Sequence, residues 1–173
     1  MGVIAIHEKA SYLRDIVMGA DDGVITTFAI VAGSAGASLS SKVVIVLGLA
    51  KLLADALSMG ASVYMGIKSE AEYEKGKRDV CWKSESPIKQ SFATSASFIV
   101  AGITPLIPFL FNLNHSFLIS SLILVLTLFI LGSFKNLNIK KSWVRGGIEM
   151  LLVGGLAAIV AYGTGFLIEK YFV

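Results

Sequence analysis

Three side chains that can bind a metal ion stand inside apolar stretches of this sequence: Asp22, Asp55 and Met59. A carboxylate is a hard ligand and a thioether is a soft one. A site that combines them suits a borderline divalent ion such as Fe(II) and discriminates against Mg²⁺ and Ca²⁺. Because a carboxylate releases a bound metal ion when it takes up a proton, the same side chains can exchange a metal ion for protons.

Helical geometry predicts that Asp22 and Met59 can meet. Asp22 lies about six residues, or roughly 9 Å, from the start of the first apolar segment. Met59 lies about eight residues, or roughly 12 Å, from the end of the second segment, which returns to the same side. Asp55 falls one turn deeper than Met59. Three hydroxyl side chains at helical spacing from these residues are predicted to line the same path: Thr26, Ser58 and Ser62.

The same residues also have simpler interpretations. Asp55 follows Lys51 by one helical turn, and the two can form an ion pair that serves only to neutralise them. A methionine in an apolar helix is usually a packing residue. Asp21 points about 100° away from Asp22 on a helix, which favours an interfacial position over a ligand role.

The composition is that of a membrane protein. The chain has 173 residues, of which 55% are hydrophobic and 16% charged, and its mean hydropathy is +0.76. Soluble domains carry about 25% charged residues. These values argue against a soluble enzyme and a nucleic-acid-binding protein. One cysteine, Cys81, and two histidines, His7 and His115, leave little for a thiolate or histidine metal cluster, and no permanently bound cofactor is expected.

The apolar residues form five runs long enough to cross a bilayer, which takes about 20 residues in a helix. The runs are continuous rather than alternating, which excludes a barrel of transmembrane strands. The sequence therefore predicts an all-α, multi-pass membrane protein with one transmembrane domain over residues 1–173. The predicted spans are residues 16–38, 43–67, 91–111, 116–134 and 146–168.

The basic residues predict the orientation. Most of the 15 lysines and arginines lie in residues 1–15, 68–90 and 135–145. Because basic residues accumulate on the cytoplasmic side, these three segments and the N-terminus are predicted to be cytoplasmic. The net charge of +3 is therefore a sign of topology, and nucleic acid is not expected as a partner.

Small residues and prolines predict how the spans pack. Gly19-x-x-x-Gly23 and Gly33-x-x-x-Ala37 in the first span allow close helix approach. Five helices are few to enclose a polar path, so a homodimer with the first span at the contact is expected. Pro105 and Pro108 are predicted to interrupt the helix of the third span.

The sequence resembles the vacuolar iron transporter family in several places along its length. Residues 14–33, which contain Arg14-Asp15 and Asp21-Asp22-Gly23, are similar to the family's first-span signature. Residues 48–60, Pro105-Leu-Ile-Pro108 and Met150-Leu-Leu-Val-Gly154 resemble its second, third and fifth spans. The resemblance implies a homodimer that moves Fe(II), and often Mn(II), out of the cytoplasm in exchange for protons. It also implies that the Asp and Met of the metal path are Asp22 and Met59 here.

Three differences from that family are visible. One is Lys51, which occupies a second-span position that is usually uncharged. Full-length members carry a long, glutamate-rich helical insert between spans two and three, where this chain has only residues 68–90. Glu70 and Glu74 share one helix face there and are candidates for capturing metal in the cytoplasm. Many members also have an acidic residue directly before the tyrosine that follows Ser-Met, where this chain has Val63 before Tyr64.

The first hypothesis is a divalent-metal exporter driven by protons, in which Asp22 binds the ion and Met59 selects a softer metal. Asp55 is then a deeper relay or the partner of Lys51. Two alternatives remain open: a membrane scaffold or metal sensor that acts through residues 68–90, and a proton-coupled carrier for another substrate. An enzyme is not expected, because no nucleophile–base pair is visible. Short loops favour a prokaryotic inner membrane, with a vacuole-like organelle as the alternative.

Overall fold

The structure is a computed structural model that describes residues 2–75, 86–138 and 141–172, with the side chains of residues 2–9, 74–75 and 138 outside that description. Every secondary-structure element of the described residues is a helix. In chain order the elements are α1 (Gly2–Gly36), α2 (Ser41–Lys75), α3 (Pro87–Gly102), the 3₁₀ helix η1 (Thr104–Leu106), α4 (Ile107–Leu110), α5 (Ser116–Asn138) and α6 (Trp143–Phe172).

Within the described residues, five helical segments of 22 to 33 residues are long and apolar enough to span a membrane. They form because a chain in lipid must satisfy its backbone hydrogen bonds internally, which a continuous helix does. The predicted all-α fold with five spans is therefore confirmed. α2 continues to Lys75, beyond the apolar segment, because the charged residues that follow it are good helix formers.

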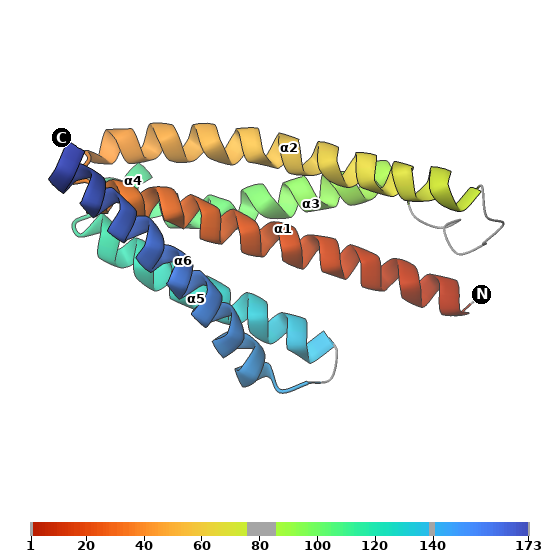
Figure 1. The fold of residues 1–173 in the computed structure, drawn as a ribbon. Helices are drawn as coiled ribbons and strands as arrows, with labels where there is room; N and C mark the ends of the chain where they lie inside the picture. Colours follow the sequence, from red (N-terminus) through yellow and green to blue (C-terminus); the bar gives the residue numbers. More distant parts are fainter. Residues whose placement is uncertain (1, 76–85, 139–140, 173) are drawn as a thin grey trace.

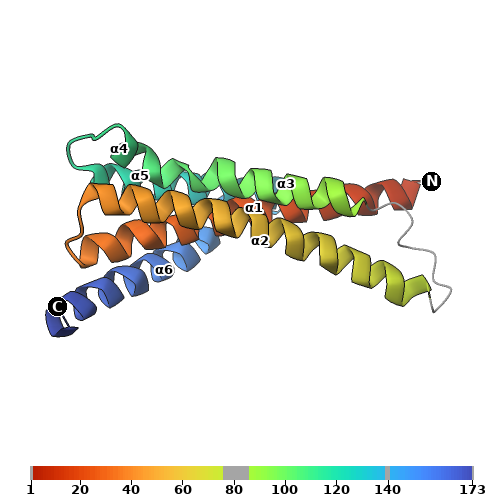
Figure 2. The same cartoon turned by 90° about the horizontal axis from the view of Figure 1, so that it is seen from above.

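α1 occupies the centre of the bundle and contacts α2, α3, α5 and α6. In Figure 1, α1 lies in front of α3, with α2 above it and α6 below. We call the end that holds the start of α1 and the end of α2 the N-terminal end of the bundle. Toward this end the α5–α6 hairpin diverges from α1 (Figure 1), and α2 diverges from α1 and α3 (Figure 2).

Glycines set the distance between the helices. A Cβ atom on Gly23 of α1 would collide with the backbone of Phe98 in α3, and one on Gly165 of α6 would collide with the backbone of Gly33 in α1. Gly132 of α5 and Gly146 of α6 meet in the same way. Backbones that approach this closely gain dispersion contacts, which drive helix association where no hydrophobic effect acts between helices.

The third span is interrupted between α3 and α4. Pro105 and Pro108 have no N–H to donate, so carbonyl groups at the break need other partners. The hydroxyl of Thr104 donates to the carbonyl oxygen of Ala101 at 2.7 Å. Ser120 of α5 donates to the carbonyl oxygen of Pro105 at 2.7 Å, so α5 stabilises the broken helix.

Candidate metal site between α1 and α2

A groove of about 480 Å³ lies between α1 and α2. Its walls carry polar and sulfur-containing side chains together with one aliphatic residue. The residues are Met18 and Asp22 from α1 and Asp55, Ser58, Met59, Ser62 and Val63 from α2. The structure thus brings Asp22, Asp55 and Met59 into one groove.

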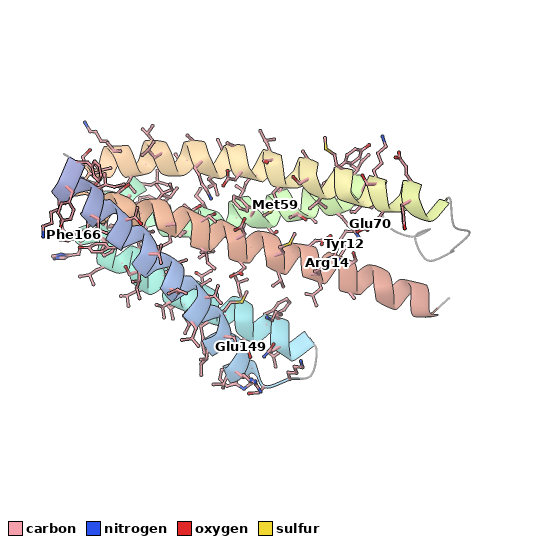
Figure 3. The ribbon with its side chains drawn as sticks, in the orientation of Figure 1. Tyr12, Arg14, Met59, Glu70, Glu149 and Phe166 are labelled. Carbon is pink, nitrogen blue, oxygen red and sulfur yellow. The ribbon has the colours of Figure 1, made fainter. Side chains whose placement is uncertain are left out.

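Helical periodicity explains why these residues share the groove. Met18 and Asp22 are four residues apart on α1, so their side chains lie one above the other. Asp55, Met59 and Ser62 repeat at intervals of four and three on α2, which places them on one face of that helix. Figure 3 shows Met59 in the middle of α2, where that helix passes α1.

Two groups of predicted residues lie outside the groove lining. Thr26 is absent from it, and its hydroxyl donates to the backbone carbonyl of Asp22 at 2.6 Å. Glu70 is exposed near the C-terminal end of α2, well away from Met59 (Figure 3). The side chain of Glu74 lies outside the described residues.

Lys51 and Asp55 form an ion pair with 2.7 Å between Nζ and Oδ2. The Lys51 ammonium also lies 5.3 Å from the centre of the Phe98 ring. The Lys51–Asp55 ion pair, the alternative role predicted for Asp55 from the sequence, is therefore present. Asp55 also lines the groove. Among the described residues, Asp22 is the groove carboxylate that has no ion pair within 4 Å.

We expect the Lys51–Asp55 pair to set the charge of the groove. Asp55→Asn leaves a cation facing Asp22 and should weaken Mn(II) binding, whereas Lys51→Gln adds a free carboxylate and should strengthen it. Each single change should alter the free energy of binding by about 0.5–1 kcal/mol, as for a partly exposed pair, and the double variant should return close to the wild type because the two changes in charge cancel. Isothermal titration of the four proteins with Mn(II) measures these differences. Equal affinity in all four proteins would show that the pair does not set the charge of the groove.

One chain alone supplies few metal ligands. Across the described residues, no three His, Cys, Asp or Glu side chains come together in a way that could hold a metal ion. The groove offers two carboxylates, one of them paired, together with the thioethers of Met18 and Met59. Further oxygen atoms for a bound ion are those of the Ser58 and Ser62 hydroxyl groups and those supplied by water, backbone or another chain.

A buried polar cluster between α1 and α3 was not predicted from the sequence. Asp15 is about 1% exposed and accepts a hydrogen bond from Arg14 Nε at 2.9 Å. Gln90 of α3 is fully buried and donates to Ser11 Oγ at 3.2 Å. The spacing of Ser11, Asp15 and Asp22 at intervals of four and seven residues was a usable signal, because it places them on one face of α1.

Curated proteins of similar sequence are vacuolar iron transporters by name. The "Vacuolar iron transporter" of Toxoplasma gondii is 28% identical over 230 residues, covering 94% of this chain and 76% of the relative. The "Vacuolar iron transporter homolog 3" of Arabidopsis thaliana is 26% identical over 173 residues, covering 95% of this chain and 86% of the relative. The "Vacuolar iron transporter 1" of Eucalyptus grandis is 45% identical over 71 residues, covering 38% of this chain and 28% of the relative.

The model of the VIT family matches this chain in two segments, residues 13–84 and 79–166. The segments meet at residues 79–84, between α2 and α3. A split match is expected there if the family model contains a stretch that this chain lacks. The two segments include every residue of the groove and nearly all of the five spans. The chain therefore belongs to the VIT family, the family of the vacuolar iron transporters.

Proposed function

We propose that this protein is a homodimeric transporter that exports Fe(II), and also Mn(II), from the cytoplasm in exchange for protons. The observation that carries the proposal is the groove in which Asp22 of α1 faces Met59 of α2. The names of the relatives support iron as the cargo. In this proposal Asp22 binds the metal ion and takes up the returning proton, and Ser58 and Ser62 line the path.

The chemistry of the groove favours a borderline divalent ion. The hard carboxylate of Asp22 and the soft sulfur of Met59 together suit Fe(II), whereas Mg²⁺ and Ca²⁺ prefer oxygen ligands alone. Lys51 neutralises Asp55, so the groove carries about one net negative charge in addition to its hydroxyl groups. A weakly charged site also favours release, because transport requires that the ion leave as well as bind.

The open side of the groove supports a dimer. The side chain of Asp55 is 44% exposed, and Asp22 is partly exposed, although both lie within membrane spans. A charged group facing lipid is costly, so such groups usually face protein or water. On α1 the small residue Ala29, two turns along the helix from Asp22, is also partly exposed. A second copy placed against this face would cover the groove and add its own carboxylates.

The orientation is part of the proposal. The start of α1, the end of α2, the end of α5 and the start of α6 all carry basic residues and all lie toward the N-terminal end of the bundle (Figure 1). The tendency of basic segments to remain in the cytoplasm supports placing that end there. Metal would then enter the groove from the cytoplasm and leave at the end that carries the α1–α2 connection.

Flux in proteoliposomes tests the function. Purified protein is reconstituted, and entry of Fe(II) and of Mn(II) into vesicles is followed with a metal-sensitive dye, with and without an imposed pH gradient. Metal flux that follows the proton gradient in direction and size supports proton exchange. A folded dimer that moves neither metal would contradict the proposal and would favour a sensor or scaffold.

Met59→Leu should change selectivity more than rate. Leucine has a similar volume, so packing is kept while the sulfur ligand is removed. We expect the preference for Fe(II) over Mn(II) to fall by about threefold to tenfold, because Mn(II) depends less on a soft ligand. Competition flux with both ions measures the preference. Met65→Leu is the matched control, since Met65 lies on α2 outside the groove and is 64% exposed; an equal shift in both variants would contradict a ligand role for Met59.

A further inference from the structure

A second cavity, of about 590 Å³, lies between α1 and the α5–α6 hairpin toward the N-terminal end of the bundle. Its lining residues come from α1, α5 and α6, and Figure 1 shows that the α5–α6 hairpin diverges from α1 toward this end. Much of its wall is apolar, with Leu13 and Val17 on α1 and Met150 and Val153 on α6. Val153 is 61% exposed, so the cavity opens sideways, toward the acyl chains of the surrounding lipid.

Four charged side chains also line this cavity: Arg14, Asp21, Lys135 and Glu149. Figure 3 shows Arg14 on α1 and Glu149 on α6 at this end of the bundle. Arg14 and Glu149 have partners outside the cavity lining, in Asp15 and Arg145. The Arg145–Glu149 pair joins two well-exposed side chains and is therefore weak. Arg14 binds the buried Asp15 through Nε, and its exposed guanidinium has further N–H groups that can meet a ligand.

Asp21 and Lys135 line the cavity, and neither forms an ion pair in the described structure. Asp21 Oδ1 is buried and has no hydrogen-bond partner. No ion pair within 4 Å joins Asp21 to Lys135 or to any other described residue, although both side chains line the same cavity. A buried acceptor without a partner costs free energy, and so does an unpaired charge near lipid. A ligand that carries both a cationic and an anionic group would satisfy the two residues at once.

We propose that this cavity binds the headgroup of a zwitterionic phospholipid with a primary ammonium group, of the phosphatidylethanolamine type. The ammonium lies against the carboxylates of Asp21 and Glu149, and the phosphate lies against Lys135 and Arg14. The acyl chains pass the apolar wall into the membrane. Lys135 disfavours a divalent metal ion in this place, and the two carboxylates disfavour a lipid that carries only negative charge.

The number of N–H groups on the ammonium of the lipid headgroup makes the proposal testable. A primary ammonium donates three hydrogen bonds, whereas the trimethylated ammonium of phosphatidylcholine donates none. Stepwise N-methylation removes these donors while the phosphate and the acyl chains stay the same. Recognition by Asp21 and Glu149 therefore predicts that affinity falls with each methyl group.

Native mass spectrometry of the full-length, metal-free protein measures this directly. The lipids are phosphatidylethanolamine, its monomethyl and dimethyl forms, phosphatidylcholine and phosphatidylglycerol, all with the same acyl chains. We expect phosphatidylethanolamine to bind about tenfold more tightly than phosphatidylcholine. This ratio of affinities corresponds to the net free energy of one charge-assisted hydrogen bond. Equal binding of these two lipids, or tighter binding of phosphatidylglycerol, would overturn the proposal.

Variants locate the site. Asp21→Asn and Glu149→Gln should each reduce the preference for phosphatidylethanolamine, and Lys135→Met should weaken every phospholipid to a similar degree. Glu169→Gln is the matched control, because Glu169 is a carboxylate of α6 that does not line the cavity and instead accepts a hydrogen bond from Ser38. A preference that survives both Asp21→Asn and Glu149→Gln would place the lipid elsewhere and overturn the proposal. Because no metal or transport is involved, the result is independent of the proposed function.

Discussion

Asp22→Ala is expected to abolish metal transport. Asp22 is the groove carboxylate without an ion pair in the described structure, and it faces Met59 across the groove. Its removal leaves only thioethers, hydroxyl groups and the neutralised Asp55 to hold a divalent ion. Because changes around a metal ligand already cost 10–100-fold, loss of the ligand itself should lower Fe(II) flux by at least about 100-fold. Initial rates in proteoliposomes with an imposed pH gradient measure the effect.

Glu169→Ala provides the control for that experiment. It also removes one carboxylate, but at the opposite end of the bundle, and Glu169 does not line the groove. Flux of this variant should stay within about twofold of the wild type, as for surface changes away from a site. The assignment of Asp22 fails if Asp22→Ala keeps flux comparable to that of Glu169→Ala while both proteins are folded.

Gly165→Ala is expected to separate α6 from α1. A Cβ atom at this position would overlap the backbone carbonyl of Gly33. The backbone of a packed helix cannot rotate away as a side chain can, so α6 must shift as a whole. Overpacking of this kind costs about 1–3 kcal/mol in the free energy of unfolding. The thermal unfolding midpoint of the purified protein in detergent measures the loss.

Gly163→Ala tests whether the close contact is the cause. Gly163 lies two residues away on the same helix, and a Cβ atom there would meet nothing within 4 Å. Since alanine favours a helix over glycine by about 1 kcal/mol, this variant should be as stable as the wild type or more stable. Equal destabilisation by both substitutions would contradict the packing argument.

Much of the architecture follows from local features of the sequence. The five spans were predictable because hydropathy over about 20 residues reflects the thickness of the bilayer. The meeting of Asp22 with Met59 was predictable because helical rise gives depth and helical periodicity gives the face. Membership of a transporter family also agrees with the expectation that the chain is not an enzyme.

The tertiary structure decided which faces meet. Thr26 lies one turn from Asp22, yet its hydroxyl binds the backbone and it does not line the groove. Asp21, interpreted from the sequence as an interfacial neighbour, shares a cavity with Lys135 and Glu149, which lie far along the chain. Ser11 of α1 accepts a hydrogen bond from the buried Gln90 of α3, and only the packing of the two helices shows this contact.

The physical reason is that composition and periodicity act within a helix, whereas tilt and rotation depend on contacts between helices. Hydropathy determined which segments enter the membrane, and the 3.6-residue period determined which side chains share a face. The close contacts of Gly23 with Phe98 and of Gly33 with Gly165 then determined how α3 and α6 pack on α1. These contacts join residues distant in sequence, so only the assembled bundle shows the groove beside Asp22 and the separate cavity beside Asp21.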